Sequence, residues 1–195
     1  MLNLKALIQD LTLEEKVTLI SGFDSWHTHK IERLNIPSIK MSDGPNGVRG
    51  NGNSGKSSAC FPSPISIGST WNLDLIDEIG KALGEESKLK DVDVLLGPTI
   101  NIHRHPLGGR HFESYSEDPY LTGKIATAYV KGVQSKNVAA CLKHFVANDT
   151  EFERHHISSN VDEKTLREIY LLPFEMGIPL LHPQSTRHRG YLAHP

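Results

Sequence analysis

Four side chains that can form strong hydrogen bonds follow apolar runs in this sequence: Asp43, Arg110 and the adjacent Lys143 and His144. The carboxylate can accept hydrogen bonds and the other three groups can donate them. Charge-assisted hydrogen bonds are about twice as strong as neutral ones, so such a set is suited to hold a ligand rich in hydroxyls, such as a sugar ring. Alternatively, these groups form buried ion pairs that only stabilise the protein.

Short strands are predicted directly before these groups. The segments 38–41, 92–96, which is rich in β-branched residues, and 138–142, which is wholly apolar, are typical of strands, and residues 65–67 predict a weaker one. Strands that are apolar throughout and alternate with helices indicate a parallel sheet with both faces covered. In such folds, ligands bind at the carboxyl edge of the sheet. Asp43, Lys143 and His144 follow two of these strands, and Arg110 lies in the polar loop 101–118 that follows a third.

Helices are predicted between these strands. The repeats of apolar residues predict helices over 75–88 and 119–134, and another that begins at Asp162. At the start of the chain, residues 4–11 predict a helix, and Thr12 with Glu15 forms a capping-box pattern for a second one. The segment 51–58, rich in Gly and Ser, is typical of a surface loop.

Composition narrows the class of protein. The 195 residues include 21 basic and 23 acidic side chains with no long basic stretch, which argues against a nucleic-acid partner. No segment approaches the ~20 apolar residues that span a bilayer, so we expect no membrane partner. The first 13 residues lack the pattern of a secretory signal, which favours a cytoplasmic protein; a secreted one is the alternative. The 2 cysteines and 11 histidines show no metal-ligand spacing, so we expect no metal site.

Several motifs resemble glycoside hydrolase family 3, in its intracellular fungal or yeast β-glucosidase branch. The similarity extends from about residue 11 to residue 176. Residues 146–149 (VAND) differ from the Pro-Gly-His-Gly motif of the N-acetylhexosaminidase branch, which supports the glucosidase branch. The motifs are MSDGPNG at 41–47, GP at 97–98, PLGGRHFES at 106–114, SEDPY at 116–120, KHF at 143–145, ND at 148–149 with Glu151 and Arg154, and LREIY at 166–170.

The resemblance implies an α/β fold, a partial (β/α)8 TIM-like barrel that forms the N-terminal portion of the family's N-terminal domain. It assigns substrate binding to Asp43, Arg110, Lys143 and His144, with Glu113 and Arg154 in a supporting shell. The family hydrolyses terminal β-D-glucosyl residues with retention, using one carboxylate as nucleophile and another as acid and base. Neither carboxylate is expected within this chain, so it would contain no catalytic residue, and no cofactor or metal is needed. The full-length enzyme is a possible homo-oligomer.

The resemblance ends near residue 177. A complete barrel takes about 250 residues, so residues 1–177 are expected to form a partial domain. Residues 178–195 do not fit the family pattern, and we interpret them as an aberrant tail from a shifted reading frame or a mispredicted exon. The chain is therefore expected to be an inactive fragment of a β-glucosidase. The alternative is a noncatalytic sugar-binding or regulatory truncated paralogue.

Overall fold

The computed structural model of the chain describes residues 4–50 and 57–180. It contains a three-stranded parallel sheet with the strand order β1-β2-β3 and helices between the strands. The elements in chain order are α1 (Leu4–Asp10), α2 (Leu13–Ile20), η1 (Glu32–Leu34), β1 (Met41–Asp43), α3 (Pro64–Gly68), α4 (Leu73–Leu89), β2 (Val94–Leu96), η2 (His111–Glu113), α5 (Pro119–Ser135), β3 (Ala139–Ala140), α6 (Glu163–Thr165), η3 (Leu166–Tyr170), α7 (Leu172–Gly177) and η4 (Ile178–Leu180).

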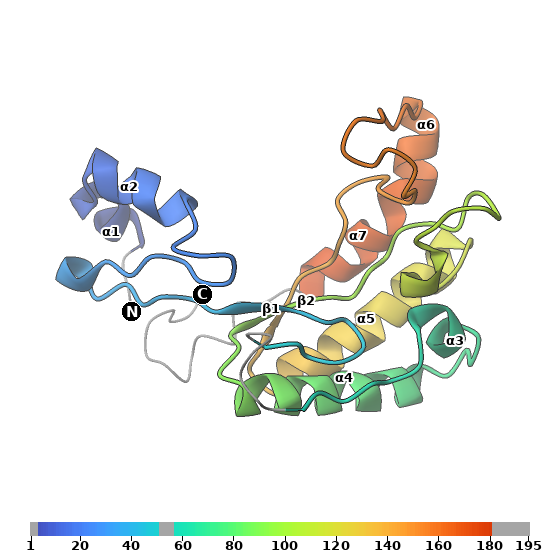
Figure 1. Cartoon of the computed structure of the whole chain (residues 1–195), viewed down its shortest axis with the longest axis horizontal. Coiled ribbons are helices and arrows are strands. Elements are labelled where there is room, and N and C mark those ends of the chain that lie inside the picture. Colours follow the sequence, from blue (N-terminus) through green and yellow to red (C-terminus); the bar gives the residue numbers. More distant parts are fainter. Residues whose placement is uncertain (1–3, 51–56, 181–195) are drawn as a thin grey trace.

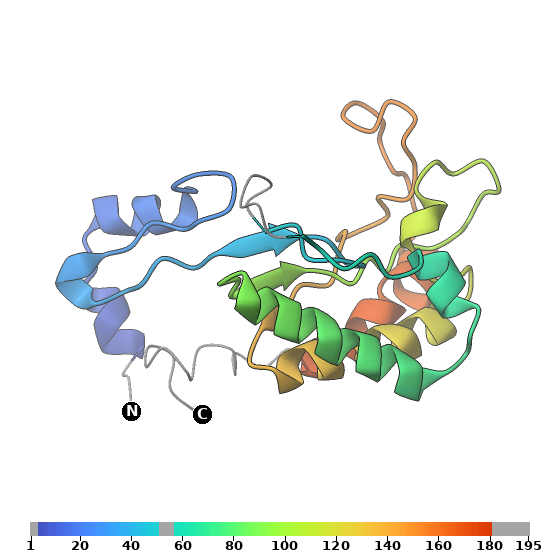
Figure 2. The same cartoon turned by 60° about the horizontal axis from the view of Figure 1, so that its bottom comes forward.

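The sheet is parallel throughout, as predicted. Ser42 of β1 pairs with Leu95 of β2, and Leu95 pairs in turn with Ala140 of β3. Helices α4 and α5 lie along one side of the strands (Figures 1 and 2), and Ser42, Leu95 and Ala140 are buried. Met41 and Val94 are only half-buried. Within the described residues, the sheet therefore has helices on one face, and the expected cover on both faces is not seen.

The core lies between α4, α5 and the sheet. Ile76 and Leu83 of α4, Ile125 and Tyr129 of α5 and Leu95 of β2 are all at most 2% exposed. The two helices come unusually close because glycines face each other at Gly80 and Gly132. A Cβ atom on Gly132 would collide with the carbonyl oxygen of Asp77 and lie 2.9 Å from the Cα atom of Gly80. The glycines thus set the distance between the two helices.

Most predicted helices are confirmed. Asn72 and Asp118 cap α4 and α5 by accepting hydrogen bonds from backbone N–H groups, and Asp162 caps α6. The predicted helix after Asp162 is interrupted, because η3 is a π-helical turn and α7 follows it with Pro173 in its first turn. Proline has no N–H to continue the helical hydrogen bonds, so the turn pattern changes there.

The predicted strand over 65–67 is wrong, because these residues belong to helix α3. Pro64 lies at the first turn of that helix, where a missing N–H costs nothing, and Ile67 is buried against the core. A short apolar run is compatible with either structure. Of the predicted loop 51–58, residues 51–56 lie outside the described part of the chain. The aberrant tail was predicted over 178–195, and residues 181–195 of it also lie outside the described part.

The first two helices lie away from the core. The predicted capping box is present, since Thr12 Oγ1 accepts from Glu15 N at 3.1 Å and Glu15 Oε2 accepts from Thr12 N at 2.9 Å. Neither α1 nor α2 contains a buried residue, and both lie at the opposite end of the molecule from α5 and α7 (Figure 1). In the described residues, no helix is long and apolar enough to cross a membrane.

Candidate functional site

Asp43 is the last residue of β1, and a tight turn follows it. Gly44 has φ +119°, and a Cβ atom at this position would collide with the carbonyl oxygen of Gly47. The chain then folds back, so that Arg49 N donates to Asp43 O at 3.0 Å. The Nη1 atom of Arg49 lies 3.5 Å from Oδ2 of Asp43. The turn at Gly44 therefore brings the guanidinium of Arg49 close to the Asp43 carboxylate.

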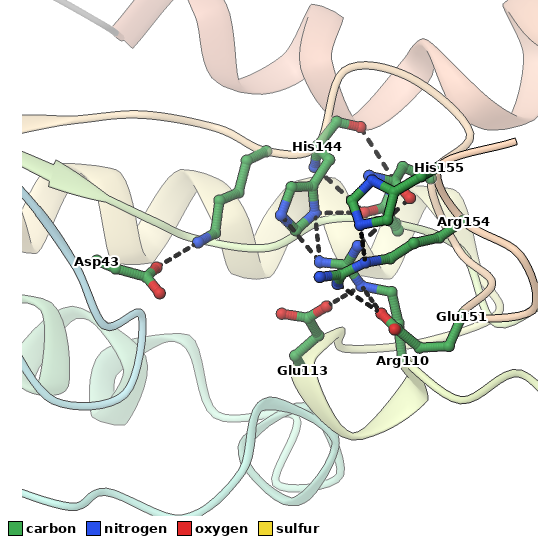
Figure 3. A network of polar contacts seen from close by, with 10 residues as sticks. Asp43, Arg110, Glu113, His144, Glu151, Arg154 and His155 are labelled. Carbon is green, nitrogen blue, oxygen red and sulfur yellow. Dashed lines mark hydrogen bonds and ion pairs between the residues drawn. The ribbon is translucent and has the colours of Figure 1, made fainter. Parts of the chain in front are cut away.

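Lys143 reaches Asp43 from the other edge of the sheet. The Lys143 Nζ atom donates to Asp43 Oδ1 at 2.6 Å, and the two side chains are 18% and 27% exposed (Figure 3). Burial alone would raise the pKa of Asp43, but the hydrogen bond and charge of Lys143, the N–H of Gly44 and the charge of Arg49 together lower it below its ordinary value. Asp43 is therefore a carboxylate at neutral pH.

His144, the next residue, is held by the buried side chain of Asn101. Asn101 Oδ1 accepts from the His144 backbone N at 3.1 Å, and Asn101 Nδ2 donates to His144 O at 3.1 Å. The His144 Nδ1 atom also lies 3.1 Å from Asn101 Oδ1. Because an amide oxygen only accepts, His144 Nδ1 carries the hydrogen and Nε2 is free to accept.

Arg110 supplies the donor to His144 Nε2. Arg110 Nη2 lies 3.0 Å from this atom. On the other side of the guanidinium, Arg110 Nε lies 2.5 Å from Glu113 Oε1 and 3.3 Å from Glu151 Oε1, and Nη1 donates to Asn148 Oδ1 at 3.3 Å. Burial, followed by the positive charges of Arg110 and Lys143, lowers the pKa of His144 to about 4. The imidazole is therefore neutral at physiological pH.

The structure thus brings the four predicted binding residues together. Asp43 pairs with Lys143, Arg110 pairs with His144, and the two pairs adjoin through the peptide bond between Lys143 and His144. The predicted supporting residues are also present. Glu113 contacts Arg110 directly, whereas Arg154 contacts it only through Glu151, at 3.0 Å from Glu151 Oε1 (Figure 3).

Four contacting residues were missed by sequence reasoning: Arg49, Asn101, Asn148 and Glu151. Asn101 is only 4% exposed in the structure, but no local pattern in the sequence distinguishes it from the other polar residues of its loop. Asn148 and Glu151 belong to the family motif but carried no assigned role. For Arg49 there was no local signal, since its contact with Asp43 depends on the turn at Gly44.

The donors and acceptors of this arrangement suit a polyhydroxylated ring, and among the described residues its carboxyl groups do not have the properties of a general acid. Lys143 and Arg110 offer donors near one carboxylate, Asp43, and the Nε2 atom of neutral His144 offers an acceptor. A glycoside-cleaving pair needs one carboxyl group with a raised pKa to protonate the leaving group. Asp43 has a lowered pKa, and Glu113 and Glu151 are both engaged by Arg110. In residues 4–50 and 57–180, no three His, Cys, Asp or Glu side chains converge as a metal site would require.

The fold and the site define a class of protein. Parallel strands that alternate with helices, with the polar groups at their carboxyl ends, are the arrangement of (β/α)8 barrel enzymes. A model described as the glycosyl hydrolase family 3 N terminal domain matches residues 4–181 of the chain. The chain therefore belongs to glycosyl hydrolase family 3.

Solved structures agree with this assignment. A crystal structure of β-glucosidase from Kluyveromyces marxianus in complex with glucose matches with a TM-score of 0.88 and 48% identity, over 92% of this chain and 22% of that one. β-Glucosidase 3B from Thermotoga neapolitana in complex with α-D-glucose matches with a TM-score of 0.83 and 42% identity, over 92% and 28% of the two chains. The three strands and their helices are part of a TIM-like barrel, which confirms the predicted fold class.

Curated relatives are also named β-glucosidases. A β-glucosidase from Rhizobium radiobacter is 57% identical over 174 residues, which is 88% of this chain and 21% of the relative. A putative β-glucosidase from Schizosaccharomyces pombe is 53% identical over 176 residues, 90% of this chain and 21% of the relative. The chain thus spans about one fifth of the length of these relatives.

Proposed function

We propose that this chain binds the terminal non-reducing β-D-glucosyl residue of a glucoside or short oligosaccharide, as part of a retaining β-glucosidase site. The glucosyl unit would contact Asp43, Arg110, Lys143 and His144. The observation that carries the proposal is the convergence of these four side chains from three strand ends, with a 2.6 Å contact from Lys143 to Asp43. Relatives of the same family are named β-glucosidases, and two solved relatives contain glucose.

The hydrogen bonds between the four side chains can be replaced by hydrogen bonds to sugar hydroxyls. A hydroxyl both donates and accepts a hydrogen bond, so it can take the place of one partner in the Asp43–Lys143 pair and still leave the other group with a hydrogen bond. Neutral His144 can donate or accept after a small rotation, while Arg110 remains held by Glu113. Each group would then keep a partner in the bound state, which avoids the cost of an unsatisfied buried polar atom.

We propose further that the isolated 195-residue chain does not hydrolyse the glucosidic bond. Every carboxylate of the described site is occupied by a cation: Asp43 by Lys143 and Arg49, and Glu113 and Glu151 by Arg110. None of these carboxylates is therefore left free to protonate a leaving group or to attack an anomeric carbon. Residues 178–195, the predicted aberrant tail, play no part in this proposal.

The test is a titration of the full 195-residue chain with D-glucose and with methyl β-D-glucoside, followed by NMR chemical shifts of the His144 imidazole and the Arg110 guanidinium. We expect both signals to shift, with a dissociation constant on the order of millimolar. L-Glucose, the mirror-image sugar, serves as the matched control and should not shift them. Asp43→Ala should abolish the response, whereas Asp91→Asn, a change at an exposed carboxylate outside the site, should not.

Two results would contradict the proposal. Equal shifts with D- and L-glucose, or an undiminished response in Asp43→Ala, would show that the site does not recognise a glucosyl unit. Release of nitrophenol from nitrophenyl β-D-glucoside by wild-type chain, absent from Asp43→Ala, would show that the chain does hydrolyse the bond.

A further inference from the structure

Asp149 is a buried carboxylate that lies outside the proposed sugar contacts. Its side chain is 4% exposed, and Tyr170 donates to its Oδ2 atom at 3.5 Å. Arg104 Nε lies 3.6 Å from the same oxygen, and Arg104 Nη1 donates to the Tyr170 hydroxyl at 3.2 Å. These three residues come from three different segments: the loop after β2, the loop after β3 and η3.

The place of Asp149 in its loop is informative. The segment 145–161, here called the rim loop, connects His144, which follows β3, to α6. Two of its side chains contact Arg110: Asn148, directly before Asp149, and Glu151, two residues after it. In sequence, Asp149 therefore lies between the two residues through which the loop contacts the Arg110 guanidinium.

Few other contacts fasten this part of the rim loop. Ala147 is buried in a small apolar cluster with Ile102 and Tyr170, and Ser159 Oγ donates to the carbonyl oxygen of Ala147 at 2.9 Å. Residues 150–160 are otherwise half-buried or exposed. A buried carboxylate is costly unless it is paired, so loss of Arg104 and Tyr170 as partners of Asp149 would destabilise the loop in this position.

We propose that Asp149 is a positioning residue for Arg110. By fastening the rim loop to Arg104 and Tyr170, it holds Asn148 and Glu151 against the guanidinium and keeps Arg110 beside His144. The inference rests on the proposed glucosyl site, because it explains how one of the four binding side chains is kept in place. Asp149 itself contacts none of these four side chains in the described structure.

The test uses His144 as a reporter, in the full 195-residue chain and without any sugar. The charged groups that act on His144 are Arg110 and Lys143, which lower its pKa, and Glu113 and Asp43, which raise it. If Asp149→Asn releases the rim loop and Arg110 moves away, the NMR titration midpoint of His144 should rise by roughly half a unit or more. Tyr170→Phe, a milder change that removes only the hydroxyl, should shift it in the same direction by less.

Two controls separate positioning from a general loss of structure. Gly132→Ala disturbs the packing of α4 against α5 and contacts neither His144 nor Arg110, and it should leave the midpoint unchanged. Arg110→Gln should raise the midpoint by itself, and adding Asp149→Asn to Arg110→Gln should then raise it no further. A shift that persists in the absence of Arg110 would overturn the proposal.

An unchanged His144 midpoint in Asp149→Asn would also overturn it. If Asp149→Asn does not fold, Tyr170→Phe decides, since an unchanged midpoint there contradicts the proposal and a rise that disappears in Arg110→Gln supports it. Because the titration needs no sugar, its failure is distinguishable from a failure of the glucose titration. A shifted His144 midpoint without glucose binding would support the role of Asp149 and contradict the glucosyl site. Glucose binding with an unchanged midpoint would do the opposite.

Discussion

The Nζ atom of Lys143 lies 2.6 Å from Oδ1 of Asp43, although the two residues are 100 positions apart in sequence. Asp43 ends β1 and Lys143 follows β3, so the contact crosses the carboxyl edge of the sheet over β2. The pair joins the outer strands of the described sheet at the proposed binding site. Loss of this ion pair should therefore change both ligand binding and the free energy of unfolding.

We predict that Asp43→Asn lowers the free energy of unfolding by about 1 kcal/mol at neutral pH, the range of a half-exposed ion pair. Because the pKa of Asp43 is lowered in the folded chain, this stabilisation is present above the ordinary aspartate range and is lost as the pH falls through the lowered value. Urea unfolding followed by circular dichroism, from about pH 7 to about pH 3, measures the difference. A difference of the same size at every pH would contradict the assignment, and the exposed Asp91→Asn is the control.

His144 should produce a second pH dependence, at higher pH. Its folded pKa of about 4 lies below the ordinary 6.5, so the unfolded chain binds the proton first as the solution is acidified. Stability is then fully present above about pH 6.5 and falls towards pH 4. In His144→Gln, the loss between these limits should be smaller than in wild type by on the order of 1 kcal/mol, after allowance for solvent screening. His156→Gln, at an exposed position, is the control. If His144→Gln shows the same dependence of stability on pH as the wild type, the His144 imidazole is not held neutral.

The positions of the main site residues could be predicted because they depend on a local pattern. Apolar residues before Asp43 and before Lys143 predict strands, and parallel strands place their carboxyl ends at one edge. The family motif added Arg110 at the same edge. These inferences need only the order of elements along the chain, which local sequence determines well.

The partners of these residues could not be predicted in the same way. Asn101 holds His144, and Glu151 contacts Arg110, across 43 and 41 positions of sequence, through loops with no periodic pattern. Which side chain fills such a position depends on the path of the loop in three dimensions. The predicted strand at 65–67 was wrong because a short apolar run fits a strand or a helix, and the local pattern did not reveal that Ile67 packs against the core from helix α3.

The contact between α4 and α5 gives a prediction about packing. In Gly132→Ala, the new Cβ atom would collide with backbone atoms, the carbonyl oxygen of Asp77 and the Cα atom of Gly80. Backbone atoms in two packed helices cannot move independently, so we expect a loss of roughly 2 kcal/mol or more in the free energy of unfolding. Gly123→Ala on the same helix is the matched control, because its Cβ atom meets only the flexible side chain of Met176. Thermal unfolding of the two variants should differ clearly, and equal melting temperatures would contradict the close approach of the helices.

Buried Lys90 and partly buried Glu86 form an ion pair that fastens the segment after Asp43 to α4. Lys90 Nζ lies 2.9 Å from Glu86 Oε1 and 2.6 Å from Ser58 Oγ, and its side chain is 4% exposed. Glu86 in turn accepts hydrogen bonds from the backbone N–H groups of Val48 and Ala59, at 2.9 and 2.8 Å. The pair therefore holds both ends of the segment that contains Arg49.

Replacing Lys90 should lower the free energy of unfolding far more than the loss of an exposed charge would. Lys90→Met leaves the partly buried Glu86 carboxylate without its cation, and breaking a pair in this way costs about 3 kcal/mol, the lower end of the range for buried pairs. Lys88→Met, at an exposed position of the same helix, should cost less than about 0.5 kcal/mol. Urea unfolding of both variants measures the contrast. If Lys90→Met is as stable as Lys88→Met, then Glu86 does not need Lys90, and its backbone hydrogen bonds alone are sufficient to hold the segment.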